Sequence, residues 1–148
     1  MINDQLKKAL LNINFLEKFN KIYEQYPYTG EELDKVSSKV IVGFLNGGEY
    51  HCKYDSKHKF YNVKPLKEDN YNSSVNFTIK YGVAQFVLNV KINGEGTGGP
   101  FTVLSLKIGA EKRIHDPRFS SLDDLKKILM ELLYLYDEIM EELGSSND

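Results

Sequence analysis

The sequence contains no tryptophan, one cysteine and only four prolines, and these shortages limit the chemistry open to the chain. With Cys52 as the sole thiol, an intramolecular disulfide cannot form. Zinc sites usually use four well-spaced ligands, whereas this chain offers three histidines and one cysteine in total. His51 and Cys52 are neighbours on an expected strand, so they point to opposite faces and Cys52 fits a small core residue. We therefore expect neither a metal nor a cofactor.

Long apolar runs and an excess of basic charge are also missing. No stretch approaches the eighteen apolar residues that would span a bilayer, and residues 1–8 lack the layout of a signal peptide. The net charge is −2 and the pI about 5.9, whereas a nucleic-acid binder needs a concentrated basic face. These features predict a cytoplasmic protein that binds neither membrane nor nucleic acid.

No catalytic motif is recognisable. The glycine-rich segment 94–99 is followed by Pro100 and Phe101, whereas a phosphate-binding loop needs Lys and Ser or Thr there. We interpret this segment as a flexible hairpin loop that uses the conformational freedom of glycine. Cys52, His115 and Asp116 could in principle form a triad, but no local signature marks them as one. The chain is therefore predicted not to be an enzyme.

Apolar periodicity predicts a helix at each end of the chain. Residues 4–26 carry apolar side chains three and four apart, and Pro27 ends that pattern. The last helix is expected to begin after an N-cap at Ser121 and to end with Gly144 in the C′ position. Residues 144–148 are predicted to form a disordered tail.

The middle of the chain predicts β-structure. Strict alternation of apolar and polar residues marks strands at 75–81 and 84–92, joined at Gly82. Further strands are expected at 39–45, 50–54, 60–63 and 101–108, with a hairpin turn at 46–48. The predicted fold is a single α+β domain over residues 1–148. It is an antiparallel β-meander of four to six strands flanked by an N-terminal and a C-terminal helix, both on its apolar face.

The end of the last helix is acidic. From Asp137 onward the chain has Glu138, Glu141, Glu142 and Asp148, and no lysine or arginine. Carboxylates at a helix C-terminus are slightly unfavourable for the helix, so this placement serves either solubility or a basic partner. The predicted partner-binding residues are therefore Glu31, Glu32, Asp137, Glu138, Glu141 and Glu142. In this prediction the connector with Glu31, Glu32 and Asp34 extends the same patch.

Residues 117–125, with the pattern Pro–Arg–Phe–Ser–Ser–Leu–Asp–Asp–Leu, lead into the last helix. A Pro–aromatic–Ser–x–x–Asp–Leu lead of this kind, together with size, acidity and element order, resembles immunity proteins of bacterial polymorphic toxin systems. These include the contact-dependent growth inhibition (CdiI-type) immunity proteins. The resemblance implies a non-enzymatic, monomeric protein that binds one cognate toxin domain and blocks its active site. Many such toxins are basic nucleases, which an acidic surface would suit.

Two other functions fit the composition. A secretion chaperone of the type III kind is also small, acidic and α/β, but it would be a homodimer. A small-ligand binder or enzyme would use a pocket between the sheet and the helices, with Asn76, Thr78, Gln85 and Asn89 as its polar residues. Alternating polar residues of this kind are also typical of a solvated sheet face.

Overall fold

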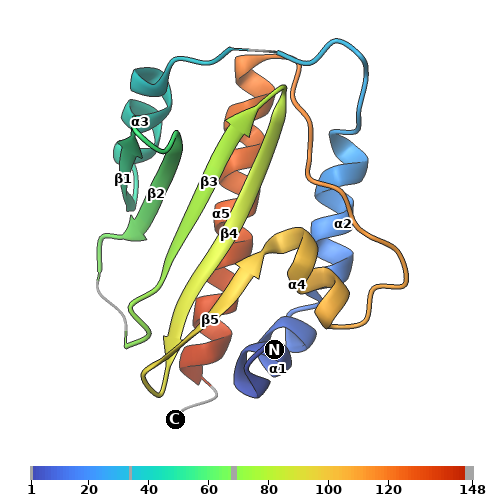
Figure 1. Ribbon diagram of the computed structural model, residues 1–148, viewed down its shortest axis with the longest axis vertical. Coiled ribbons are helices and arrows are strands. Elements are labelled where there is room, and N and C mark those ends of the chain that lie inside the picture. Colours follow the sequence, from blue (N-terminus) through green and yellow to red (C-terminus); the bar gives the residue numbers. More distant parts are fainter. Residues whose placement is uncertain (1, 34, 68–69, 146–148) are drawn as a thin grey trace.

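A computed structural model describes residues 2–33, 35–67 and 70–145, which form one antiparallel sheet backed by helices (Figure 1). Neighbouring strands pair in chain order, so the sheet is a five-stranded meander. Its strands are β1 Tyr50–Asp55, β2 Phe60–Pro65, β3 Ser74–Lys80, β4 Val83–Ile92 and β5 Glu95–Pro100. This arrangement confirms the predicted α+β class and the antiparallel meander.

The long C-terminal helix α5, Leu122–Ser145, runs behind the strands and contacts β4 (Figure 1). The hydroxyl of Ser121 accepts a hydrogen bond from the N–H of Asp124 at 3.1 Å, which confirms the predicted N-cap. Its apolar stripe is buried, including Leu125, Ile128 and Leu132. The helix includes Gly144 and Ser145, so the predicted C′ glycine and the start of the disordered tail are wrong. Residues 146–148 of that tail lie outside the described residues.

A row of aromatic rings joins the sheet to the N-terminal helices. Tyr61, Phe77 and Phe86 occupy the same register position on β2, β3 and β4, with ring centroids 4.7 and 4.9 Å apart. Phe101 lies 5.7 Å from Phe86 and contacts Phe15 edge-on at 5.4 Å. Offset and edge-to-face contacts of this kind are the favourable geometries for aromatic pairs. The row therefore fixes one sheet face against the helices.

The predicted N-terminal helix over residues 4–26 is two helices, α1 Asp4–Asn12 and α2 Phe15–Gln25. Asn14 between them is left-handed, with φ 58° and ψ 48°. Asparagine is one of the few residues besides glycine that adopt this conformation at low cost. The break directs Phe15 toward Phe101, which a straight helix would not do.

Two predicted strands are helices instead. Residues 39–45 lie in α3, Ser38–Asn46, and residues 101–107 form α4, Phe101–Lys107. Ile41 and Leu45 are the buried residues of α3, four apart, which matches one turn of a helix. The glycine-rich segment predicted as a loop is mostly strand β5, paired along its length with β4. In the described part of the chain, no helix is both long enough and apolar enough to cross a membrane.

Candidate functional site

One face of the sheet has no helix of the described residues over it, and we call this the open face. The strand register places alternate residues of each strand on it, and their side chains are half-buried or exposed apart from the small Ser74. In Figure 1 the described helices lie behind or beside the strands. In strands β1 to β4 the open face comprises His51, Lys53, Asp55, Phe60, Asn62, Lys64, Ser74, Asn76, Thr78, Lys80, Val83, Gln85, Val87, Asn89 and Lys91.

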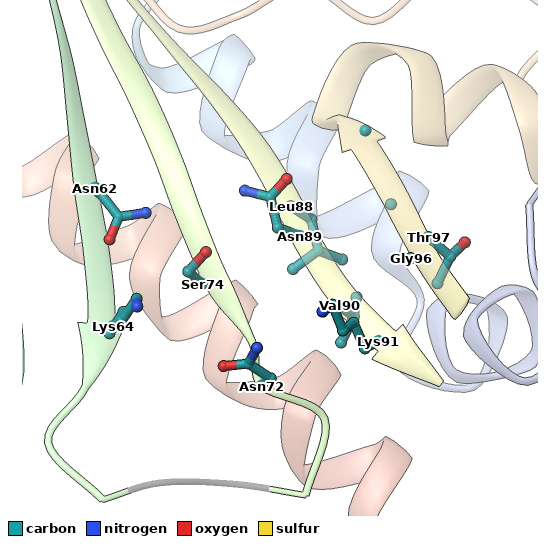
Figure 2. Close-up of a pocket in the computed structure, with 12 residues that line it drawn as sticks. Asn62, Lys64, Asn72, Ser74, Leu88, Asn89, Val90, Lys91, Gly96 and Thr97 are labelled. Carbon is teal, nitrogen blue, oxygen red and sulfur yellow. The ribbon is translucent and has the colours of Figure 1, made fainter. Parts of the chain in front are cut away.

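The open face is hollowed where β4 meets β5. The hollow has a volume of about 680 Å³, and its polar side chains are Asn62, Lys64, Asn72, Ser74, Asn89 and Lys91. Thr97 borders it through its backbone, because its hydroxyl accepts the N–H of Asn3 on the covered side. Figure 2 shows Asn62, Ser74 and Asn89 on three neighbouring strands, with β5 beside them. Gly96 and Gly98 pair with Lys91 and Asn89, so β5 contributes no side chain to this part of the face.

Gly96 and Gly98 differ in whether the surrounding atoms leave space for a side chain. A Cβ on Gly98 would lie 2.1 Å from the carbonyl oxygen of Leu88, and its φ is +129°. A Cβ on Gly96 would have no atom within 4 Å. Gly98 is therefore required for the close approach of β5 to β4. Gly96 leaves open space that a side chain could fill.

The chemistry of the hollow is that of hydrogen-bond donors and positive charge. Asn62 Nδ2 donates to Asn76 Oδ1 at 2.6 Å, which orients this amide pair between β2 and β3. Lys53, Lys64 and Lys91 are exposed and form no ion pair with any other described residue. Ammonium groups and amide N–H groups bind carboxylate, phosphate and carbonyl oxygens. The hollow is thus built to receive an electron-rich group.

Asp55 is the one carboxylate that the register places on the open face, opposite Phe60. It is engaged in the β1–β2 turn, where Oδ1 accepts the N–H groups of Lys57 and His58 at 3.0 and 2.9 Å. The hydrogen bonds from His58 are the main reason that the pKa of Asp55 is lowered. The Asp55 carboxylate therefore stabilises the turn and does not neutralise the charge of the open-face lysines.

The predicted acidic residues of α5 have partners within the chain. The Tyr50 hydroxyl donates to Asp137, Lys18 pairs with Glu138, and Asn12 Nδ2 donates to Glu142 Oε1 at 3.0 Å. Burial raises the pKa of Asp137, although the hydrogen bond from Tyr50 lowers it. Burial and that hydrogen bond both raise the pKa of Tyr50. Glu141 is the one of these four that is fully exposed.

Glu31 and Glu32 lie at the other end of α5 and do not extend this acidic patch. Glu32 Oε1 accepts the N–H groups of Thr29 and Gly30 at 2.7 and 3.1 Å. Its side chain packs on Gly82 at the turn between β3 and β4. Burial tends to raise the pKa of Glu32, but these backbone N–H groups outweigh burial and lower it. Glu31 is exposed, and Asp34 lies outside the described residues.

The residues considered for a triad are separated. Cys52 is buried on β1, where burial raises the pKa of its thiol to about 11, so the inert thiol form prevails. The segment with His115 and Asp116 passes at the far side of the sheet, beside α2 (Figure 1). Burial also raises the pKa of Asp116 to about 6, against the opposing influence of Arg113 and Arg118. Among the described residues, no three His, Cys, Asp or Glu side chains lie close enough to hold a metal.

A second, more apolar groove lies between α3 and α5. It has a volume of about 320 Å³ and is lined by Tyr26, Phe44, Lys126, Lys127, Met130 and Glu131. Lys126 Nζ lies 5.3 Å from the ring centroid of Phe44. Val40 and Tyr134, on the same two helices, are 41% and 57% exposed. These helices therefore leave apolar surface uncovered.

Asn76, Thr78, Gln85 and Asn89 lie on the open face, as expected of alternating polar residues on a solvated sheet face. They do not line a pocket between the sheet and the helices, which was the alternative. Most hollow residues were not predicted as a site. A signal existed, because Asn62 and Lys64, like Asn89 and Lys91, stand two apart in a strand and share a face.

No protein-family model, no curated protein and no solved structure matches this chain. Function must therefore be argued from the residues of the open face, the hollow and the groove.

Proposed function

We propose that this chain is a non-enzymatic immunity protein that binds a toxin domain with the open face of its sheet. The observation that supports this most is the open face itself, which five strands hold rigid and which no described helix covers. Its side chains offer several hydrogen-bond donors on one surface with regular strand spacing. Specific protein interfaces require about 800 Å² per partner, which an uncovered sheet face can supply.

The acidic end of α5 is a less suitable docking surface than its composition indicates. Three of its four predicted carboxylates, Asp137, Glu138 and Glu142, already accept hydrogen bonds or form ion pairs inside the chain. Transferring them to a partner would break these contacts and return little net free energy. Lys53, Lys64 and Lys91 on the open face form no such ion pair with any described residue. Binding a toxin before it acts would take place in the cytoplasm of the producing cell.

The test uses a matched pair of glutamine substitutions. Gln85 lies on the open face opposite Thr78, and Gln25 is exposed on α2. An inactivated toxin domain from the adjacent gene would be titrated calorimetrically into the wild type, Gln85→Arg and Gln25→Arg. We expect one-to-one binding that Gln85→Arg weakens at least tenfold, since it inserts an unpaired charge into the interface. Absence of wild-type binding, or equal binding by both variants, would refute the proposal.

A second candidate function is a homodimeric secretion chaperone. The observation that favours it is the apolar surface of α3 and α5, where Val40 and Tyr134 are exposed beside the groove of Phe44 and Met130. A second copy of the chain would cover this surface. Light scattering after size exclusion separates the two functions, because the immunity protein is expected to have the mass of one chain, 17.0 kDa.

A further inference from the structure

We infer that the hollow between β4 and β5 receives a carboxylate-bearing segment of the protein partner, held by Lys64, Lys91, Asn62 and Asn89. This inference rests on the proposed function, because it names the chemistry of the partner at the open face. It also departs from the sequence expectation, in which carboxylates of this chain meet a basic partner. A toxin that is basic overall can still present Asp or Glu side chains at this contact.

The register fixes how the recognising groups are spaced. Lys64 lies on β2 beside Ser74, and Asn89 lies beside Gly98, in one row across the strands. Lys91 stands one row further along β4, about 7 Å from Asn89. The two lysines are therefore roughly 12 Å apart at the backbone, on opposite rims of the hollow. An extended peptide with acidic side chains two residues apart, about 7 Å, can reach both ammonium groups through their flexible stems.

Charge is partitioned unevenly in the molecule. The chain has a net charge of −2, whereas the open face carries +3, from Lys53, Lys64, Lys80 and Lys91 less the negative charge of Asp55. The remaining residues therefore carry a net charge of −5. A positive site in an otherwise negative protein favours a local acidic group and disfavours a long polyanion, which would meet repulsion beyond the hollow.

The lining favours a protein segment over a nucleic acid. Proteins that bind single strands combine a long basic groove with aromatic rings on which bases stack. None of the described residues that line the hollow is aromatic, and its lysines form a short cluster. A peptide instead offers carboxylates for the lysines and backbone carbonyls for the amides of Asn62 and Asn89. The missing side chains of Gly96 and Gly98 let such a backbone approach β5 closely.

The test uses a probe that does not depend on identifying the toxin. A blocked hexaglutamate peptide would be titrated into the ¹⁵N-labelled protein, with the side-chain amide signals of Asn62 and Asn89 as the readout. Two variants alter the hollow: Gly96→Phe fills it where a Cβ meets no atom, and Lys64→Glu/Lys91→Glu reverses its charge. The control, Lys8→Glu/Lys39→Glu, changes the net charge equally on exposed helix positions that do not line the hollow.

We expect saturable shifts of both amide signals in the wild type. Each hollow variant should weaken the apparent affinity at least tenfold, and the control less than twofold. Unshifted amides, or an equal loss in the control, would overturn the inference. So would larger shifts at lower concentration from a twelve-residue oligothymidylate, which would indicate a nucleic-acid site, or equal shifts from succinate, which would indicate a small-anion site. Failure of the toxin to bind the wild type concerns the proposed function alone, since this titration contains no toxin.

Discussion

Gly98 and Gly96 stand two residues apart on β5 with opposite structural demands. A Cβ on Gly98 would overlap the carbonyl oxygen of Leu88, at a positive φ that other residues avoid. We expect Gly98→Ala to lower the free energy of unfolding by at least about 2 kcal/mol. Gly96→Ala, the control, should change it by less than about 0.5 kcal/mol. Urea unfolding measures both, and similar values for the two variants would contradict the close packing of β5 on β4.

The raised pKa of Asp116 predicts that the stability of the fold depends on pH. Burial raises its pKa to about 6 in the folded state, above its value of 3.8 in a solvated chain. The folded state therefore holds the proton more tightly than the unfolded state. As pH rises from about 4 to about 6, the unfolded state ionises first and the fold loses stability. Below pH 4 both states are protonated, and this contribution vanishes.

Asp116→Asn should remove this penalty, because the amide stays neutral. We expect the variant to be more stable than the wild type at pH 7 by about 1–2 kcal/mol, and the difference to disappear near pH 4. Thermal unfolding across this range provides the measurement. A difference that is constant with pH would show that the substitution acts through packing or hydrogen bonding and that Asp116 ionises normally.

Individual residues were predicted best where one local rule decided them. His51 and Cys52 had to face opposite sides of a strand, and they do. Ser121 was recognisable as an N-cap because Asp123 and Asp124 follow it in the first turn of the helix. The hollow required knowing which strands neighbour each other, since Lys64 and Lys91 are on β2 and β4. Which strands are neighbours depends on how the strands pair in the sheet and cannot be read from any one segment of the sequence.

At the scale of elements, short apolar runs misled the strand assignment. Residues 39–45 and 101–108 are rich in β-branched and aromatic residues, which favour strands by composition. Periodicity alone cannot separate short strands from buried helices. Yet Phe101, Leu104 and Ile108 stand three and four apart, and all three are buried, as one face of a helix requires.

Strand β5 shows the reverse error. Its sequence, Glu–Gly–Thr–Gly–Gly–Pro, contains one residue that favours strands, Thr97, and proline there removes one donor. It is a strand because β4 extends to Ile92 and offers backbone partners as far as Glu95. Backbone pairing needs no side chain, so composition carried little signal. Gly96 and Gly98 also leave the space that forms the hollow. Interpreting this segment as a loop therefore also meant that the hollow was not predicted.

The edge of the sheet at β1 is closed by a side chain of α3. Asn46 Oδ1 accepts the N–H of Cys52 at 2.7 Å, and its Nδ2 donates to the carbonyl of Cys52 at 3.0 Å. This amide imitates a neighbouring strand and blunts the edge. Asn46→Ala should therefore cost about 1–3 kcal/mol of unfolding free energy and increase aggregation.

Asn12→Ala is the matched control for that variant. Asn12 also uses its amide, donating to Glu142, but on an exposed surface where water replaces the contact. We expect a change within about 0.5 kcal/mol and no added aggregation. Equal losses in the two variants, measured by urea unfolding and static light scattering, would mean that Asn46 does not protect the edge.

At the scale of the whole molecule, the one-sided arrangement follows from strand patterning. Alternating apolar and polar residues over β3 and β4 predicted one covered and one wetter face, and the burial pattern agrees. Helices α1, α2, α4 and α5 share the covered side, where the aromatic row joins them to the sheet. The fold thus buries its apolar surface on one side and leaves polar side chains on the other.

The molecule then carries two charged regions, the basic hollow and the acidic end of α5, and charge reversal can decide between them. In Glu138→Lys/Glu141→Lys/Glu142→Lys, the pairs with Lys18 and Asn12 are lost and a new lysine faces Lys18. Because these side chains are partly exposed, we expect a loss of only about 1 kcal/mol in unfolding free energy. Toxin affinity should change less than threefold, whereas Lys64→Glu/Lys91→Glu should lower it at least tenfold.

Calorimetric titration of the toxin domain into both variants, at two salt concentrations, separates the regions. The hollow variant should also lose most of the salt dependence of binding, since its lysines supply the attraction that salt screens. If the α5 variant instead loses affinity and salt dependence while the hollow variant binds normally, the partner docks on the acidic helix end. In that event the internal contacts of Glu138 and Glu142 must open when the toxin binds.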